Sequence, residues 1–312
     1  MNVRERARTE LTPDLFVSEQ AAEGLAETIA RPSITYWQDA WRRLKANPAA
    51  MFGLLVLAVM TIMAIIGPMM LPFEYDYQDI MKIGKPPGGG HWLGTDDLGR
   101  DLWVRLWKGA RLSLSIGLIA ASLDLIIGVI FGGIAGFLGG RFDDIMMRFV
   151  EVLYGIPNLL LMIMLSVVLG PGLFTIILVM VVTGWVGMAR LVRGQVLQLK
   201  EQEYVLAARA LGANPWRIIL KHLVPNAMGP IIVSVTMSIP GAIFFEAFLS
   251  FIGLGVPLPL ASWGSLANNG YEFIRLYPWL LIYPASAIAI TMLSFNLFGD
   301  GLRDALDPRL RR

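Results

Sequence analysis

Six apolar stretches, each close to the length that crosses a bilayer, dominate this 312-residue sequence. They cover about residues 50–72, 112–138, 145–169, 173–192, 229–255 and 279–300. A helix needs roughly 20 predominantly apolar residues to span a membrane. Charged residues make up only 16% of the chain, whereas a soluble domain has about 25%. The sequence therefore predicts an all-α integral membrane protein with six transmembrane helices.

Two of these spans contain proline. Pro157 lies in the third and Pro240 in the fifth. Proline lacks a backbone N–H, and membrane helices tolerate it where neighbouring protein satisfies the freed carbonyls. We expect a kink at Pro157.

The distribution of lysine and arginine predicts the orientation, because cytoplasmic loops are enriched in these residues. With a cytoplasmic N-terminus, the inside segments hold Arg4, Arg6, Arg8, Arg31, Arg42, Arg43, Lys45, Arg141, Arg148, Arg190, Arg193, Lys200, Arg209, Arg217, Lys221, Arg303, Arg309, Arg311 and Arg312. The outside segments hold Lys82, Lys85, Arg100, Arg105, Lys108, Arg111 and Arg275. Both termini are therefore predicted to be cytoplasmic, with an external loop at 73–111.

The region before the first span, residues 1–48, is polar and does not resemble a cleavable signal peptide. We interpret it as a cytoplasmic tail, partly disordered up to Ala30, followed by the six-span domain at 49–312. Tyr36, Trp37, Ala40, Trp41 and Leu44 would share one face of a short helix. Such a helix either lies at a membrane surface or packs on a neighbour, and the sequence leaves both open.

Nothing in the sequence indicates catalysis or metal binding. Cysteine is absent, and the two histidines, His91 and His222, fall on opposite predicted sides of the membrane. Neither H-E-x-x-H nor G-x-S-x-G is found. We therefore expect neither an enzyme nor a metal site.

A polar segment, Glu203 to Pro230, separates the fourth and fifth spans. Tyr204, Ala207, Ala208 and Leu211 recur at helical spacing. Gly212 suits a left-handed helix end, after which Asn214 can cap a second helix that has Pro215 in its first turn. We expect two short helices joined by a tight turn, the second ending at Pro225. This segment either docks into a partner or only connects two spans.

The same segment resembles the "EAA" loop of permease subunits of binding-protein-dependent ABC importers. Ala207, Ala208, Gly212 and Pro225 match that pattern, whereas Leu206, His222 and Val224 stand where the family has Glu, Ile and Leu. The resemblance implies a coupling loop at 193–228 that docks on an ATPase subunit. The implied coupling residues are Tyr204, Ala207, Ala208, Arg209, Gly212, Pro215, Arg217, Pro225 and Asn226.

Two further stretches, His91–Leu114 and Phe245–Gly270, resemble signatures of the peptide and nickel branch, in its oligopeptide and dipeptide permeases of the C type. The resemblance implies a type I ABC importer permease fold in a bacterial or archaeal cytoplasmic membrane. It implies half of a translocation pathway for di- or oligopeptides that works by alternating access. Partners would be a homologous second permease, an extracytoplasmic solute-binding protein, and two ATPase subunits that hold ATP and Mg, with no cofactor on this chain.

Two acidic residues lie within predicted spans. Asp124 falls on a ridge of small residues with Gly117, Gly128, Gly132, Gly136 and Gly140, so it should face protein. Glu246 has Ala242 and Ser250 one helical turn away. Buried membrane carboxylates are functional candidates, so both are candidates for the translocation path, with packing between helices as the alternative. A rival function is an ion-gradient-driven secondary transporter that uses these two carboxylates.

The external loop carries a charged cluster, Asp96, Asp97, Arg100 and Asp101. We expect an amphipathic helix over Leu98–Leu112, capped by Asp96 or Asp97, with Trp103 and Trp107 at the outer membrane interface. The cluster either caps this helix or contacts an external binding protein.

Overall fold

The computed structural model describes residues 35–307, and residues 40–307 pack together as one unit. The described chain is helical, with no strand and only two isolated bridges, Gly88 to His91 and Thr95 to Asp101. The predicted tail up to residue 34 lies outside the described residues, as do the basic residues Arg4, Arg6, Arg8, Arg31, Arg309, Arg311 and Arg312.

Five helices are long and apolar enough to cross a membrane. They are α3 (Pro48–Ile66, continued by η2, Gly67–Met69), α4 (Leu102–Leu138), α7 (Leu173–Leu199), α11 (Met228–Phe251) and α13 (Trp279–Leu306). A bent pair, α5 (Gly140–Gly155) and α6 (Asn158–Leu169), makes a sixth if the two count as one span. The prediction of an all-α protein with apolar spans is confirmed.

The pair α5 and α6 bends by 81° at Ile156-Pro157. Ile156 has extended backbone angles, as expected for a residue that precedes proline. The predicted kink is therefore a complete break. Pro240, in contrast, lies inside the unbroken helix α11.

The external segment contains one short 3₁₀ helix, η3 (Ile80–Lys82), and no separate α-helix before α4. α4 has 37 residues and is roughly 55 Å long at 1.5 Å per residue, well beyond the hydrocarbon core of about 30 Å. Its N-cap is Asp101, whose Oδ1 accepts from the N–H of Val104 at 2.9 Å. The predictions of a distinct helix over Leu98–Leu112 and of a cap from Asp96 or Asp97 are wrong.

Helix α4 packs along α7 through the predicted small-residue ridge. Gly128, Gly132 and Gly136 lie against Met188, Ala189 and Val196 of α7, and a Cβ on Gly132 would collide with the carbonyl oxygen of Ala189. Gly140 does not belong to this ridge, because α4 ends at Leu138 and Gly140 is the exposed first residue of α5.

Helix α2 (Tyr36–Ala46) precedes α3. Leu44 is buried in a cluster with Ala50 of α3 and Ala305 of α13, whereas Trp41 remains 46% exposed. The helix therefore packs on its neighbours at Leu44, which supports that alternative over a helix that only lies at a membrane surface.

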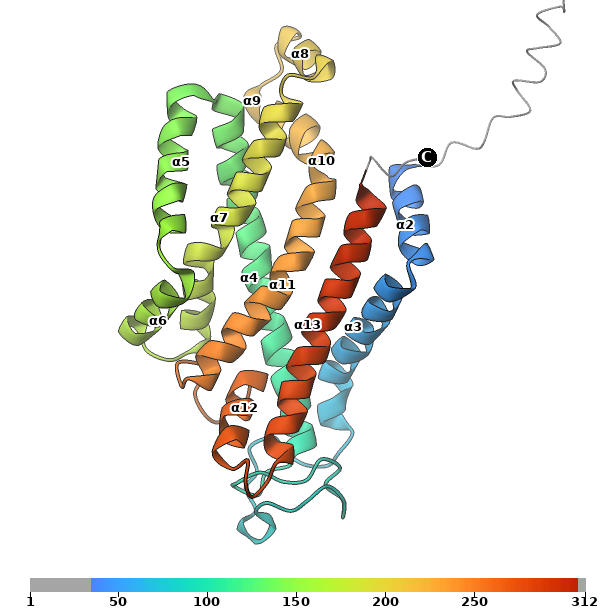
Figure 1. Cartoon of the computed structure of the whole chain (residues 1–312), viewed down its shortest axis with the longest axis vertical. Coiled ribbons are helices and arrows are strands. Elements are labelled where there is room, and N and C mark those ends of the chain that lie inside the picture. Colours follow the sequence, from blue (N-terminus) through green and yellow to red (C-terminus); the bar gives the residue numbers. More distant parts are fainter. Residues whose placement is uncertain (1–34, 308–312) are drawn as a thin grey trace, which may run out of the picture. The chain divides into compact units, whose positions relative to one another are not determined.

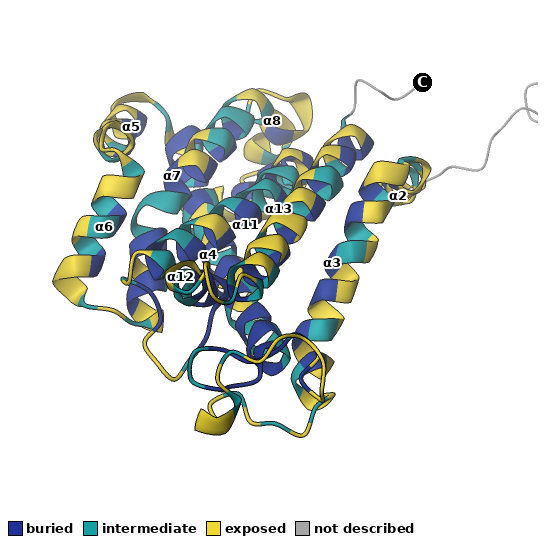
Figure 2. Ribbon diagram, turned by 60° about the horizontal axis from the view of Figure 1, so that its bottom comes forward, coloured by how far each residue is buried: buried dark blue, intermediate teal, exposed yellow. Residues whose placement is uncertain are grey.

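The described unit has two distinct ends. Figure 1 shows α8 (Glu203–Ala210), the last turns of α13 and the helix that contains Leu44 at one end, with α12 (Trp263–Glu272) and the segment between α3 and α4 at the other. Figure 2 shows exposed residues along the outer faces of α3, α5 and α6. Exposed apolar side chains on these helices, such as Leu55, Ile145 and Met164, suit contact with lipid.

Candidate functional site

The segment between α7 and α11 folds into a helical knob, residues 203–226. α8 ends in a Schellman motif, in which Gly212 N–H donates to Arg209 O and Ala213 N–H donates to Ala208 O, both at 3.0 Å. Gly212 has φ +77°, the left-handed conformation predicted for it. The tight turn between two helices is confirmed.

The second helix of the knob starts as predicted and ends later. Asn214 caps it by accepting from the N–H of Trp216 at 3.0 Å, and Pro215 occupies the first turn. α9 (Pro215–Ile218) continues through a π-helical turn, η4 (Ile219–Leu223), into α10 (Val224–Asn226). The helix therefore passes Pro225 rather than ending there. The wider turn lies directly before this proline, whose ring would clash with a carbonyl in regular α-helical geometry.

The inner side of the knob is anchored on the membrane helices. Val205, Ile218 and Leu223 are buried in one cluster with Val196 of α7 and Ile231 of α11. Arg209 adds a contact with α4, since its guanidinium lies 5.2 Å from the ring centre of Phe137. The knob is thus packed on the ends of several spans and is more than a loose connection.

The outer side of the knob exposes large apolar side chains among charged ones such as Arg209 and Arg217. Its large exposed side chains are Tyr204 (40%), Leu206 (46%), Leu211 (88%), Trp216 (54%) and Leu220 (61%). Hydrophobic patches of this kind mark sites of interaction with another protein or a membrane. The predicted coupling residues Tyr204, Ala207, Arg209, Gly212, Pro215, Arg217, Pro225 and Asn226 are exposed, and Ala208 is half-buried.

Part of this surface was not predicted from the sequence. Trp216 and Leu220 lie one helical turn apart and belong to the outer face, as does Leu206, which stands where the family pattern has Glu. The spacing of Trp216 and Leu220 on a polar loop was the available signal.

Asp124 and Glu246 have different surroundings. Asp124 faces Gly184 of α7, and its Oδ1 is buried without a hydrogen-bond partner among residues 35–307. Glu246 is fully buried and accepts hydrogen bonds from Ser113 and Ser250, both at 2.8 Å. Through Ser113 the carboxylate of Glu246 links α11 to α4. The structure does not bring Asp124 and Glu246 together in any described contact.

Ser113 extends this link to a third helix. Its Oγ also accepts from the backbone N–H of Trp263, the first residue of α12, at 3.2 Å. Glu246 is therefore part of a polar network that holds α4, α11 and α12 together. This arrangement supports the packing alternative for Glu246.

The charged cluster of the external segment is buried. Asp96 accepts from Arg100 Nε at 2.7 Å and lies 3.4 Å from Arg105 Nε, and all three side chains are at most 4% exposed. The Nδ1 of His91 lies 2.7 Å from the Oδ2 of Asp101. These groups therefore pair with one another, which supports the structural alternative over contact with an external protein.

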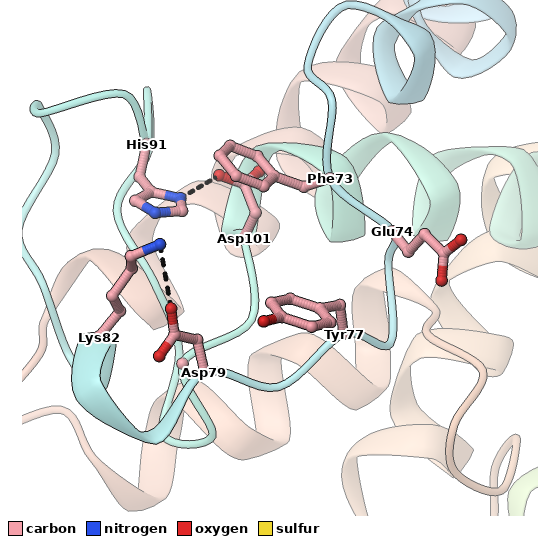
Figure 3. A pocket seen from close by; sticks show the side chains of 8 residues that line it. Phe73, Glu74, Tyr77, Asp79, Lys82, His91 and Asp101 are labelled. Atoms are coloured by element: carbon pink, nitrogen blue, oxygen red, sulfur yellow. Dashed lines mark hydrogen bonds and ion pairs between the residues drawn. The ribbon is translucent and has the colours of Figure 1, made fainter.

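A small cavity lies beside this cluster. Figure 3 shows His91 directed at Asp101, and Lys82 at Asp79, around a pocket that Phe73 and other residues line. Its volume is about 10 Å³, which is room for about one water molecule. Across residues 35–307 no group of three or more His, Asp and Glu side chains is placed to hold a metal ion.

Long apolar helices packed through small residues, with an anchored and exposed helical knob between two spans, define a multi-pass membrane protein of the transport-permease class. Residues 128–312 match the family described as "Binding-protein-dependent transport system inner membrane component". Residues 35–87 match "N-terminal TM domain of oligopeptide transport permease C". The chain belongs to this family of inner membrane permeases, as its sequence motifs predicted.

Relatives cover nearly the whole chain. The oligopeptide transport system permease protein OppC of Bacillus subtilis is 54% identical over 96% of this chain and 98% of its own length. The dipeptide transport system permease protein DppC of the same organism is 55% identical, over 95% and 93%. OppC of Escherichia coli K12 is 40% identical, over 94% and 98%.

A solved structure shares the fold. The MetNI methionine ABC transporter, in an inward-facing conformation, has a chain that superposes with a TM-score of 0.50 at 19% identity. The match covers 66% of this chain and 97% of that one. At this identity the likeness shows the ABC importer permease fold alone.

Proposed function

We propose that this chain is a permease subunit of an ATP-driven importer of di- or oligopeptides and forms half of the translocation pathway. Support comes from relatives named as oligopeptide and dipeptide permeases, at 40–55% identity over nearly the full length. Family membership places the chain with importer permeases and removes the main reason to consider an ion-coupled secondary transporter.

The partners are those that membership of this permease family implies. Two ATPase subunits would supply ATP and Mg, a homologous second permease would complete the path, and an extracytoplasmic binding protein would deliver the solute.

The single observation that carries the proposal is the knob. Its outer face exposes Leu211 and Trp216, while its inner face is packed on α7 and α11.

Alternating access would use this attachment. Because Val205, Ile218 and Leu223 share one buried cluster with α7 and α11, motion of a docked ATPase would move the knob and both helices together. ATP can shift the equilibrium only if it favours one packing of the helices over the other. ATP binding would favour the outward-open packing, and hydrolysis would return the inward-open one.

The orientation is part of the proposal. The end that carries α8 also carries Leu44 and the last turns of α13 (Figure 1). Arg42, Arg43, Lys45 and Arg303 belong to the same end by sequence position. This enrichment of basic residues supports a cytoplasmic knob and cytoplasmic termini.

Reconstitution in proteoliposomes tests the function. The assembled complex should take up a labelled peptide with ATP, continue when a protonophore collapses the proton gradient, and stop when ATP is removed. The opposite pattern would favour the ion-coupled transporter.

Asp124→Asn distinguishes a role of the Asp124 carboxylate in the translocation path from a role in packing between helices. Loss of uptake at normal complex yield would place Asp124 on the path.

Co-purification tests the docking. Arg209 and Arg217 are exposed on the knob, whereas Arg275 is exposed three residues after α12, which lies at the opposite end of the bundle (Figure 1). Charge reversal at Arg209 and at Arg217 should weaken recovery of the ATPase subunits, and Arg275→Glu should not. Equal recovery with all three variants would count against docking at the knob.

A further inference from the structure

Helix α5 exposes two different stripes. Ile145, Phe149 and Val152 are 54–70% exposed and suit contact with lipid. A second stripe, Asp144, Arg148 and Glu151, has the i, i+4, i+7 spacing of one helix face and is also exposed. Charged groups in a membrane segment face protein or a water-filled cavity rather than lipid. The second stripe must therefore lie against something other than lipid.

The charged stripe of α5 forms one wall of a groove, and α7 forms the other. The groove encloses about 480 Å³ and is lined by Asp144, Met147, Arg148, Val150, Glu151, Arg190 and Arg193. This volume falls within the range of small-molecule sites, about 300–1,000 Å³. It is also far larger than the cavity at the other end of the bundle.

The arginines of α7 are held in place by neighbours. Arg193 makes a bidentate pair with Asp143, with both N–O distances 2.6 Å. Arg190 lies over the ring of Tyr154 at 4.8 Å. Within residues 35–307, by contrast, Asp144, Arg148 and Glu151 make no hydrogen bond or ion pair.

The groove carries both signs of charge. The groove is lined by two acidic groups, Asp144 and Glu151, and three basic groups, Arg148, Arg190 and Arg193. Asp143, which does not line the groove, neutralises Arg193, so the remaining formal charges cancel and the groove does not favour a plain anion or cation. A solute with one ammonium and one carboxylate group could satisfy Glu151 and Arg148 at once.

The groove reaches from the knob end toward the membrane centre. α5 begins at Gly140 and α7 ends at Leu199, both near the knob end in Figure 1. At 1.5 Å per residue, Glu151 lies roughly 16 Å along α5 and Arg190 roughly 14 Å from the end of α7. Both residues therefore lie about three helical turns from the knob end of their helices.

We propose that the groove between α5 and α7 is a binding site for zwitterionic peptide on the knob side of the translocation path. Arg148 binds the carboxylate of the peptide and Glu151 binds its ammonium group. Charge-assisted hydrogen bonds of this kind are stronger than neutral ones. The proposal rests on the proposed function, peptide import, and adds the residues that take the solute.

Cysteine labelling in the assembled complex tests the site without requiring uptake. The chain has no cysteine, so Asp144→Cys gives one thiol in this subunit and leaves Arg148 and Glu151 intact. In inside-out vesicles, a membrane-impermeant maleimide should label this thiol. It should not label Ile145→Cys on the lipid-facing stripe, and it should label Arg141→Cys near the exposed start of α5.

Protection identifies the ligand class. Trialanine at high concentration should slow labelling of Asp144→Cys, whereas N-acetyl-trialanine amide, which has neither charge, should not. Labelling that neither peptide slows would overturn the proposal. Failure to label Asp144→Cys while Arg141→Cys reacts would also overturn it, because the stripe would then be covered by the second permease.

Uptake provides the second readout. Glu151→Gln and Arg148→Gln should each lower trialanine uptake about 10-fold or more at wild-type complex yield, and Arg141→Gln should match wild type. If Glu151→Gln and Arg148→Gln both lower the yield of the assembled complex, these residues hold an interface between subunits, and the proposal is contradicted. If the wild-type complex imports no peptide but the protection pattern holds, the proposed function fails while the zwitterion site stands.

Discussion

At the knob end of the bundle Leu211 and Trp216 lie exposed, whereas at the opposite end Asp96, Arg100 and Arg105 are buried. The knob places apolar side chains where a soluble surface would be polar. The external segment places charged side chains where a core would be apolar. The buried charges are paired with one another as ions within the chain, but the exposed apolar groups have no partner among the described residues. The difference supports the proposal that another protein covers the apolar side chains of the knob, whereas the charged cluster of the external segment is paired within the chain.

The largest expected effect is at the buried charge cluster. Asp96→Ala removes the carboxylate that pairs with buried Arg100 and Arg105, and leaves Arg100 only the more distant Asp97, at 3.7 Å. Breaking a buried pair in this way costs about 3–5 kcal/mol. Thermal unfolding of the purified complex should show a large loss of stability, while Glu74→Ala, an exposed change in the same segment, should change it by less than about 0.5 kcal/mol. Equal thermal unfolding midpoints for Asp96→Ala and wild type would show that the charge cluster does not stabilise the fold.

The next effect is at the turn of the knob. Gly212 has φ +77°, where a side-chain-bearing residue costs about 1–2 kcal/mol and a β-branched one more. Gly212→Val should therefore lower both ATPase binding and coupled uptake about 10-fold or more. Gly212→Asn is the matched control, because Asn tolerates this conformation. If Val and Asn behave alike, the left-handed turn does not matter for docking.

A smaller effect is expected at Asp97, at the edge of the cluster. Burial, together with the charge of Asp96, raises the pKa of Asp97 above its ordinary value. The folded state therefore holds this proton more tightly than the unfolded state, and stability falls as the pH rises through the folded pKa. Asp97→Asn should unfold at a slightly higher temperature than wild type at pH 7. The difference should disappear as the pH falls below the folded pKa, and a variant less stable at pH 7 would contradict this account.

Local chemistry made much of the knob predictable. Gly212, Asn214 and Pro215 each have a conformational preference that acts within a few residues, and all three take the predicted roles. The apolar spans follow from hydropathy, and Pro157 predicted a kink at the position where the structure has a complete break. The passage of the helix through Pro225 was not predictable, because it depends on a π-helical turn.

Tertiary contacts decided the rest. Asp101 rather than Asp96 caps α4, while Asp96 pairs with the buried side chains of Arg100 and Arg105. Ser113 binds Glu246 across 133 positions of sequence, which no local pattern reveals. Residues with a role set by the tertiary structure were therefore the ones that the sequence placed wrongly or left open.

The measurement that tests the central claim most directly is the affinity of the purified ATPase subunit for the permease pair in nanodiscs. Trp216 and Leu211 form part of the exposed apolar face of the knob, whereas Leu293 is a comparably exposed leucine on α13. Trp216→Ala and Leu211→Ala should weaken binding about 10-fold or more, because buried aromatic and apolar anchors dominate interface energies. Leu293→Ala should bind like wild type. Unchanged affinity in both knob variants would contradict the claim that this face is where the ATPase docks.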